Sequence, residues 1–134
     1  MADTLSSKAR DLISRPVLAS VATLNPDGSP QITPVWIDLD GDHVVFNTAQ
    51  GRIKARNLET DSRVAVSVID PDDQYNVIAF RGTVANITTD GADEHINGLT
   101  KKYIDQDEYP FRAPGEVRVK FEIAPERIRH QKQG

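Results

Sequence analysis

With 134 residues, the chain is expected to form a single domain around one continuous core. Its 20 acidic and 16 basic residues give a net charge of −4, which argues against a broad nucleic-acid-binding or anionic-membrane-binding surface. The absence of cysteine excludes disulfides, thiolate nucleophiles and thiolate-bound metals, and it fits a cytoplasmic location.

The first predicted element is a helix near the amino terminus. Apolar residues recur at helical spacing from Leu5 to Ile13, behind Asp3 or Thr4, and either of these side chains can cap a helix start. Pro16 breaks the pattern, so we expect the helix to end at about Ser14. The stretch has no apolar run typical of a signal peptide, and no segment approaches the ~20 apolar residues of a membrane span.

Three strands joined by two hairpins are predicted next. Residues 17–24 alternate between two faces, both of which we expect to be mostly covered. Pro and Gly in the segments 25–30 and 39–43 favour tight turns. These turns would join strands at 17–24, 31–39 and 43–48 into an antiparallel meander, because parallel strands need longer connections.

The second half of the chain predicts three more strands and another helix. Residues 63–70 and 76–88 are rich in β-branched and apolar side chains. In residues 90–107, apolar side chains recur at helical spacing, with acidic residues early and lysines late, as the helix dipole favours. In residues 116–130, apolar side chains alternate with charged ones such as Arg118, which predicts a strand with one buried and one solvent-facing side.

Together these elements predict a mainly β fold of the α+β class. About six antiparallel strands in a chain of this length favour one sheet closed into a barrel, with two or three helices on its outside or at its ends. Closure of the sheet would also remove exposed strand edges.

The segment TAQGRIKARN, residues 48–57, is the strongest candidate for a ligand site. A strand is expected to end at its start, and Gly51 allows close approach of the backbone. The helix that follows would direct its free N–H groups toward the place where Arg52, Lys54 and Arg56 can gather. Such an arrangement is typical of a phosphate-binding site.

The residues alone leave the geometry of this segment open. If the helix includes Arg52, that residue and Arg56 stack one turn apart while Lys54 lies on another side. All three cations converge only if Arg52 is still in the loop. The alternative interpretation is a solvated helix face, whose cations pair with Glu59 and Asp61.

Other catalytic and metal-binding patterns are absent from the sequence. The spacings of a P-loop, a G-x-G-x-x-G fingerprint, a G-x-S-x-G elbow and an H-E-x-x-H zinc site do not occur. The histidines His43, His95 and His130 are scattered. The composition of residues 70–74 predicts a polar turn. Trp36 is expected to lie in the core or at a subunit interface. One anion site without a nucleophile, base or metal cluster suits a protein that takes its chemistry from a phosphorylated cofactor.

Three segments resemble the pyridoxamine 5′-phosphate oxidase-like superfamily of split β-barrels, which includes flavin and deazaflavin oxidoreductases. They are RPVLASVATLNPDGSPQITPVWIDLDGDHVVFNTAQGRIKARNLETDSRVAVSVID, FRGTVANI and VRVKFEIAPERIRH, and they extend from Pro16 to His130. Members that bind flavin mononucleotide (FMN) often have the pattern T-x-x-G-S-R-K-A around the phosphate. The matching positions here are Thr48, Gly51, Lys54 and Ala55.

The two mismatches with this pattern favour a different cofactor. Arg52 stands at the Ser position of the flavin pattern, and Ile53 stands at the Arg position. The form R-x-K-x-R-N-L, from Arg52 to Leu58, is similar instead to a short actinobacterial branch that binds the deazaflavin coenzyme F420. The resemblance therefore strengthens the interpretation of this segment as a phosphate site.

The resemblance also implies a set of cofactor-binding residues. Those expected along the tricyclic ring are Gln31, Thr33, Pro34 and Val35. Those expected around the phosphate are Thr48, Gly51, Arg52, Lys54, Arg56 and Asn57. Because two chains build each site in the superfamily, the partner subunit is expected to contribute side chains near Tyr75 and Asn76. No catalytic side chain and no metal ligand is expected.

The sequence thus predicts a homodimer that binds reduced coenzyme F420 between its subunits and passes a hydride to an organic acceptor. The coenzyme would carry the hydride, the protein would supply orientation, and solvent would supply the proton. One alternative is an FMN-dependent oxidase or reductase of the same fold. Another is a carrier that binds F420 without efficient turnover. Neither a nucleic-acid nor a membrane partner is expected.

Overall fold

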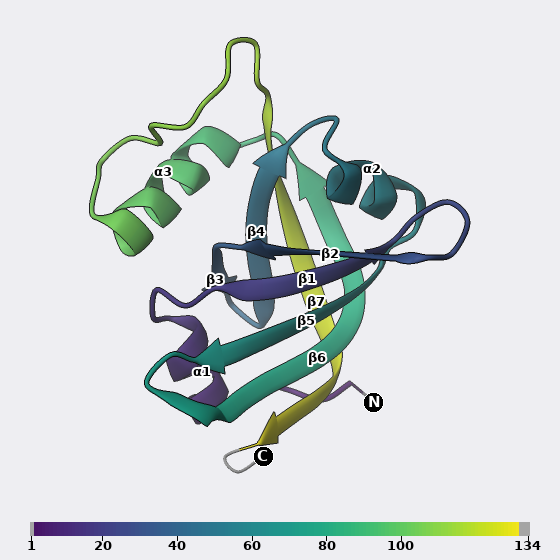
Figure 1. Cartoon of the computed structure of the whole chain (residues 1–134), viewed down its shortest axis with the longest axis vertical. Helices are drawn as coiled ribbons and strands as arrows, with labels where there is room; N and C mark the ends of the chain where they lie inside the picture. Colours follow the sequence, from purple (N-terminus) through teal and green to yellow (C-terminus); the bar gives the residue numbers. More distant parts are fainter. Residues whose placement is uncertain (1, 132–134) are drawn as a thin grey trace.

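The computed structural model describes residues 2–131 (Figure 1). Its helices are α1 (Ser7–Ile13), α2 (Ile53–Thr60) and α3 (Ala92–Ile104). Its strands are β1 (Ala19–Leu24), β2 (Pro30–Val35), β3 (Ile37–Asp40), β4 (His43–Ala49), β5 (Arg63–Asp70), β6 (Asp73–Thr88) and β7 (Arg118–Gln131). The predicted mainly β, α+β fold of antiparallel strands with peripheral helices is confirmed.

The strands of the described chain form one seven-stranded antiparallel sheet in the order β2-β1-β5-β6-β7-β4-β3. The two edge strands, β2 and β3, are consecutive in sequence and are joined through Trp36. The sheet therefore curls until its two edges meet at this residue, and Figure 1 shows β1 and β2 crossing in front of β4 and β7. This is the split barrel that the sequence predicts.

The prediction of a single strand over residues 31–39 is wrong, because the strand breaks at Trp36. The hydroxyl of Tyr103 in α3 accepts the backbone N–H of Ile37 at 2.9 Å and donates to the carbonyl of Val17 at 2.6 Å. The Trp36 indole stacks on the same tyrosine ring, with centroids 5.0 Å apart. Helix α3 thus holds the point at which the chain passes from one edge of the sheet to the other.

Helix α1 begins later than the sequence predicts. Its N-cap is Ser6, whose Oγ accepts a backbone N–H from the first turn at 3.1 Å, instead of Asp3 or Thr4. Asp3 ties the start of the chain to β7, because its Oδ2 accepts the N–H of Ile128 at 2.9 Å. The helix ends next to Ser14, as predicted.

The barrel interior is filled by the apolar side chains that point inward from alternate positions of the strands. Phe46 on β4 and Phe121 on β7 are fully buried and stack with centroids 5.0 Å apart. Gly82 on β6 lies where a Cβ atom would overlap the carbonyl oxygen of Ala124 on β7. Only glycine therefore allows these two strands to approach closely at this point.

The outer face of β1 remains open in the single chain. Val21 and its neighbours on the inner face are buried, as expected. On the outer face, however, Ser20 and Ala22 are only half-buried, and Leu18, just before the strand, is 60% exposed. The prediction that both faces are mostly covered is therefore wrong for the outer face within residues 2–131.

Candidate functional site

The turn between β4 and α2 carries the cations that the sequence singles out. Gly51 has a φ of 87°, in the left-handed region that glycine adopts freely. Arg52 follows as the N-cap of α2, with an extended backbone at φ −65° and ψ 152°, and its side chain makes no capping hydrogen bond. Because Arg52 lies outside the helix, its side chain can turn to the same side as Lys54.

Lys54 lies in the first turn of α2 and is half-buried. Burial first, and then the positive charges of Arg52 and Arg118, lower the pKa of its ammonium group. Within residues 2–131, no carboxylate lies at ion-pair distance from this ammonium. Asp61, an expected surface partner, pairs with Arg63 at 2.7 Å instead. Three cations therefore lie close together, which favours the anion-site interpretation over a solvated helix face.

Arg118 is the third of these cations, and sequence reasoning missed it. Its strand position predicts a solvent-facing side chain, but the side chain is only 5% exposed. The Nε group donates to Asn47 Oδ1 at 2.9 Å, and Nη1 donates to Glu116 Oε2 at 3.1 Å. Arg118 pairs with Ala49 in the β4–β7 ladder, which places it beside the turn that leads into α2. No local pattern could have revealed this, since the pairing joins distant segments.

A chain of hydrogen bonds under α3 holds Arg118 in place. Asn47 accepts from Arg118 through Oδ1, so its Nδ2 group is the donor to the Ala92 carbonyl at 2.9 Å and to His95 Nδ1 at 3.1 Å. Because Nδ1 accepts, His95 carries its proton on Nε2 and donates it to Asp38 at 3.0 Å. The network fixes both the amide orientation of Asn47 and the direction of the Arg118 side chain.

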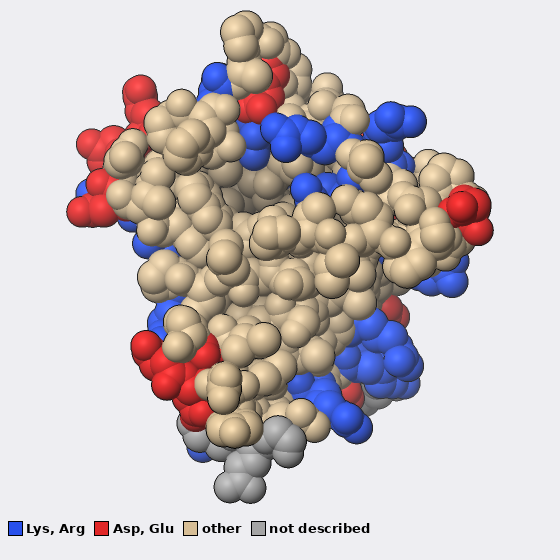
Figure 2. Space-filling view, viewed as in Figure 1, with Lys and Arg blue, Asp and Glu red and all other residues tan. Residues whose placement is uncertain are grey.

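Aromatic side chains lie next to the cation cluster. Figure 2 shows this face of the molecule hollowed between α3 and α2, with Lys and Arg atoms along the hollow. Tyr109, in the loop after α3, has its ring centroid 4.9 Å from the guanidinium carbon of Arg118 and meets Trp36 edge-on at 6.3 Å. Cations on the α2 side and aromatic rings on the α3 side suit a ligand with a flat ring and an anionic group.

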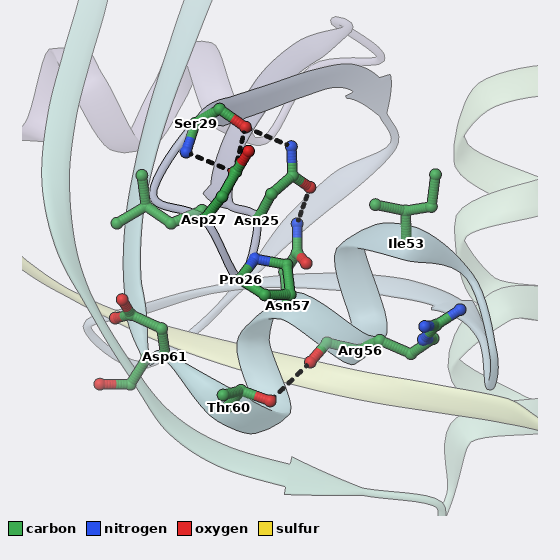
Figure 3. A pocket seen from close by; sticks show the side chains of 11 residues that line it. Asn25, Pro26, Asp27, Ser29, Ile53, Arg56, Asn57, Thr60 and Asp61 are labelled. Atoms are coloured by element: carbon green, nitrogen blue, oxygen red, sulfur yellow. Dashed lines mark hydrogen bonds between the residues drawn. The ribbon is translucent and has the colours of Figure 1, made fainter.

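A separate pocket of about 880 Å³ lies between α2 and the turn from β1 to β2 (Figure 3). Asn57 is buried at its base, where Nδ2 donates to Thr23 Oγ1 and to Asn25 Oδ1, both at 3.0 Å. Both amide hydrogens of Asn57 are therefore used inside the protein, and they hold α2 to the turn. Arg56 also lines the pocket, but Figure 3 shows its guanidinium extending away from the turn.

The residues expected along the ring lie on the edge strand β2. Gln31, Thr33 and Val35 point inward, because they pair with inward-facing residues of β1, while Pro34 is exposed. Gln31 Oε1 accepts from the Thr23 hydroxyl at 3.1 Å. The Oγ1 atom of Thr33 is buried and has no hydrogen-bond partner in the described chain. A buried hydroxyl without a partner is costly, so this atom is available to a ligand.

Thr48 lies at the end of β4 and is buried, and Gly51 follows in the exposed turn.

No group of three or more histidine, aspartate or glutamate side chains within residues 2–131 could hold a metal ion. In the same part of the chain, no helix is long and apolar enough to cross a membrane.

The fold agrees with what comparison with known proteins shows. The sequence profile of pyridoxamine 5′-phosphate oxidase matches residues 5–132 of the chain. The chain belongs to the pyridoxamine 5′-phosphate oxidase family. Among solved structures, an F420 reductase shares 32% sequence identity, with a TM-score of 0.79 over 90% of this chain and 94% of the other. No curated protein matches.

More distant solved structures show the same fold. A conserved hypothetical protein from Mycobacterium tuberculosis is 23% identical, with a TM-score of 0.72 over 98% of this chain and 88% of the other. A putative pyridoxamine 5′-phosphate oxidase from Listeria innocua is 14% identical, with a TM-score of 0.70 over 92% of this chain and 94% of the other. The split barrel is thus retained at low sequence identity.

Two residues implied by the family pattern, Tyr75 and Asn76, lie far from the cation cluster in a single chain. They follow the turn from β5 to β6, at the end of the barrel away from α2 (Figure 1). Tyr75 is 54% exposed. Asn76 donates to Asp70 at 3.1 Å, and its Oδ1 lies 2.7 Å from His130 Nε2. One chain therefore does not bring this pair to Lys54.

Proposed function

We propose that this member of the pyridoxamine 5′-phosphate oxidase family is an oxidoreductase that uses coenzyme F420. Its reaction would be the transfer of a hydride from the reduced coenzyme to an organic acceptor. The observation that carries the proposal is the cation cluster of Arg52, Lys54 and Arg118, in which the Lys54 ammonium is half-buried and has no counter-charge in the described chain. A half-buried cation without an ion-pair partner is stabilised by a bound anion, such as the phosphate of the coenzyme.

The residues present fit a coenzyme with a flat ring and a phosphate. The cations would hold the phosphate, and the unpartnered Thr33 hydroxyl on β2 would face a polar edge of the ring. The flavin pattern has an arginine at the position of Ile53, whereas this chain has its arginine one position earlier, at Arg52. This difference and the 32% identity to an F420 reductase support the deazaflavin over FMN.

The coenzyme, when bound, supplies the hydride. The protein supplies orientation and a dry wall against the ring, and positioning of this kind can lower a barrier by ~7–11 kcal/mol. The buried network behind Arg118 keeps the guanidinium in one direction before the ligand arrives, which reduces the ordering cost of binding.

We expect the protein to bind coenzyme F420 at least ~10-fold more tightly than FMN, a difference of ~1.4 kcal/mol. Both affinities are measured by titrating the purified protein with each cofactor and recording the quenching of cofactor fluorescence. Equal affinities, or tighter binding of FMN, would support the flavin alternative. A single-turnover assay with reduced F420 and a panel of acceptors then separates an enzyme from a carrier.

We also propose that two chains form each site. The outer face of β1, β5 and β6 carries a shallow depression of about 570 Å³ that is lined in part by small side chains, namely Ser20, Ala22, Ala65, Ser67 and Ala79. Charged residues also line it, and these are Asp3, Arg81, Arg127 and Arg129. A flat face of small residues lets two sheets approach closely. Packing of a second copy on this face would cover it and could bring the partner's Tyr75 and Asn76 to the cofactor.

For a dimer, sedimentation at micromolar concentration should report twice the chain mass of 14.8 kDa. Ala65→Glu places a charge in the middle of the open face and should yield monomers with weaker cofactor binding. Ala85→Glu, at an exposed alanine of β6 outside the depression, is the matched control and should remain dimeric. A wild-type monomer that binds F420 tightly would refute the shared site.

A further inference from the structure

One carboxylate lies inside the cation cluster. The side chain of Glu116 is only 5% exposed. Its Oε2 lies 3.1 Å from Arg118 Nη1, and its Oε1 lies 3.6 Å from Arg52 Nη2. Glu116 therefore touches two of the three cations that the proposed function assigns to the phosphate.

The backbone fixes Glu116 in this position. Its N–H donates to the Ala113 carbonyl at 3.1 Å, and Gly115 before it has a φ of 75°. The next residue, Val117, accepts the N–H of Gln50 at 2.8 Å, which ties this end of the loop to the turn before α2. These bonds place the backbone of Glu116 beside the cluster, and the contacts with Arg118 and Arg52 direct its carboxylate into it.

Glu116 lowers the positive charge of the site. Arg52, Lys54 and Arg118 contribute three positive charges, and the carboxylate reduces the total to about +2. Arg112 is also near, but it is paired with Asp93 at 2.8 Å. An incoming phosphate therefore meets attraction from the cations together with repulsion from one fixed negative charge.

The repulsion depends on the kind of phosphate. A phosphodiester carries one negative charge, whereas a phosphomonoester carries about −1.5 to −2 at neutral pH. Because the Coulomb energy is proportional to the charge of the ligand, a fixed carboxylate opposes a monoester about twice as strongly as a diester. The phosphate of F420 is a diester, and the phosphate of FMN is a monoester.

We infer that Glu116 is a specificity-determining residue that shifts the site toward a singly charged phosphodiester, because it reduces the electrostatic advantage that a doubly charged phosphomonoester would have at the three cations. The inference rests on the proposed function, because it assumes that the cluster binds a phosphate. Glu116 is not among the predicted cofactor-binding residues, yet it would influence the choice between two classes of phosphorylated cofactor.

The test uses three ligands that share the ring of F420 and differ in charge at one place. They are the deazaflavin nucleoside without phosphate, its 5′-phosphate, and the methyl ester of that phosphate. Fluorescence titration gives the dissociation constant of each for the wild type and for Glu116→Gln. The variant should bind the methyl ester about 3- to 10-fold more tightly and the 5′-phosphate about 10- to 100-fold more tightly, with the neutral nucleoside unchanged.

Three further variants serve as controls. Glu116→Asp keeps the charge and should keep the wild-type ratio between the two phosphates. Glu108→Gln, at an exposed acidic residue of the same loop, should change none of the affinities. Arg52→Gln lowers the positive charge at a side chain that is 57% exposed, so it should fold normally and shift the ratio in the opposite direction. It tests the charge dependence even if Glu116→Gln is unstable.

The results separate the two proposals. Equal changes for all three ligands in Glu116→Gln, or an unchanged ratio between the two phosphates in this variant, would overturn the role of Glu116 while leaving cofactor binding intact. If Glu116→Gln does not fold, an unchanged ratio in Arg52→Gln would overturn it instead. If the wild type binds neither F420 nor any of the three ligands, the proposed function fails and the inference fails with it.

Discussion

Lys54→Ala should weaken the binding of coenzyme F420 about 10- to 100-fold, because it removes the one cation of the cluster that has no counter-charge in the described chain. A charge-assisted hydrogen bond to a phosphate contributes about 1.5–3 kcal/mol, which corresponds to this range. Fluorescence titration of F420 against wild type and variant measures the change.

The stability of the free protein should not fall in this variant. A positive charge in the first turn of a helix opposes the helix dipole, and Lys54 is also repelled by Arg52 and Arg118. The melting temperature without cofactor should therefore stay within a few degrees of wild type or rise, while the stabilisation by added F420 shrinks. Lys101→Ala, at an exposed lysine of α3, is the control. Normal F420 binding combined with early unfolding of Lys54→Ala would show that the cluster is structural.

Arg118→Gln should lower both stability and cofactor affinity, in contrast to Lys54→Ala. Removing the guanidinium leaves the Glu116 carboxylate buried with only the longer contact to Arg52. Breaking a buried ion pair by removing one partner costs about 3–5 kcal/mol, and we expect the lower end because Arg52 remains. Urea unfolding should show a loss of about 3 kcal/mol, equivalent to roughly 10 °C in melting temperature.

The double variant Arg118→Gln with Glu116→Gln distinguishes a lost ion pair from lost packing. Without the carboxylate there is no unpaired buried charge, so most of the lost stability should return. Cofactor affinity should recover only in part, since loss of the carboxylate removes its repulsion while the Arg118 guanidinium is still missing. If the double variant is as unstable as Arg118→Gln alone, the cost comes from the hydrogen bond to Asn47 and the contact with Tyr109 and not from the ion pair.

The local pattern of the sequence was sufficient for most of the elements. Strand alternation and turn residues predicted the two hairpins whose turns lie in residues 25–30 and 39–43. The strand at residues 63–70 also has the predicted bounds. The basic segment after Gly51 was also visible, because glycine and clustered cations before a helix have a local physical meaning. Such features depend on near neighbours in the chain, so one sequence is enough to reveal them.

The same local reasoning failed where distant segments decide the environment. Trp36 ends a strand because Tyr103, far along the chain, takes over the hydrogen bonds of the neighbouring backbone. Arg118 is buried because the β4–β7 ladder sets it opposite Ala49, although its alternation predicts a solvent-facing side chain. The choice of helix cap, Ser6 instead of Asp3, likewise follows from a contact with β7.

The sequence by itself determined the class of fold and the position of Lys54 at the start of a helix, and the resemblance of R-x-K-x-R-N-L led to the proposed cofactor. Only the tertiary structure decided which charges surround that lysine. Arg118 and Glu116 reach it through strand pairing and loop closure, and electrostatic energy depends on distance in space and not on separation along the chain. The charge of the site, and with it the expected preference between phosphates, is therefore a property of the folded chain.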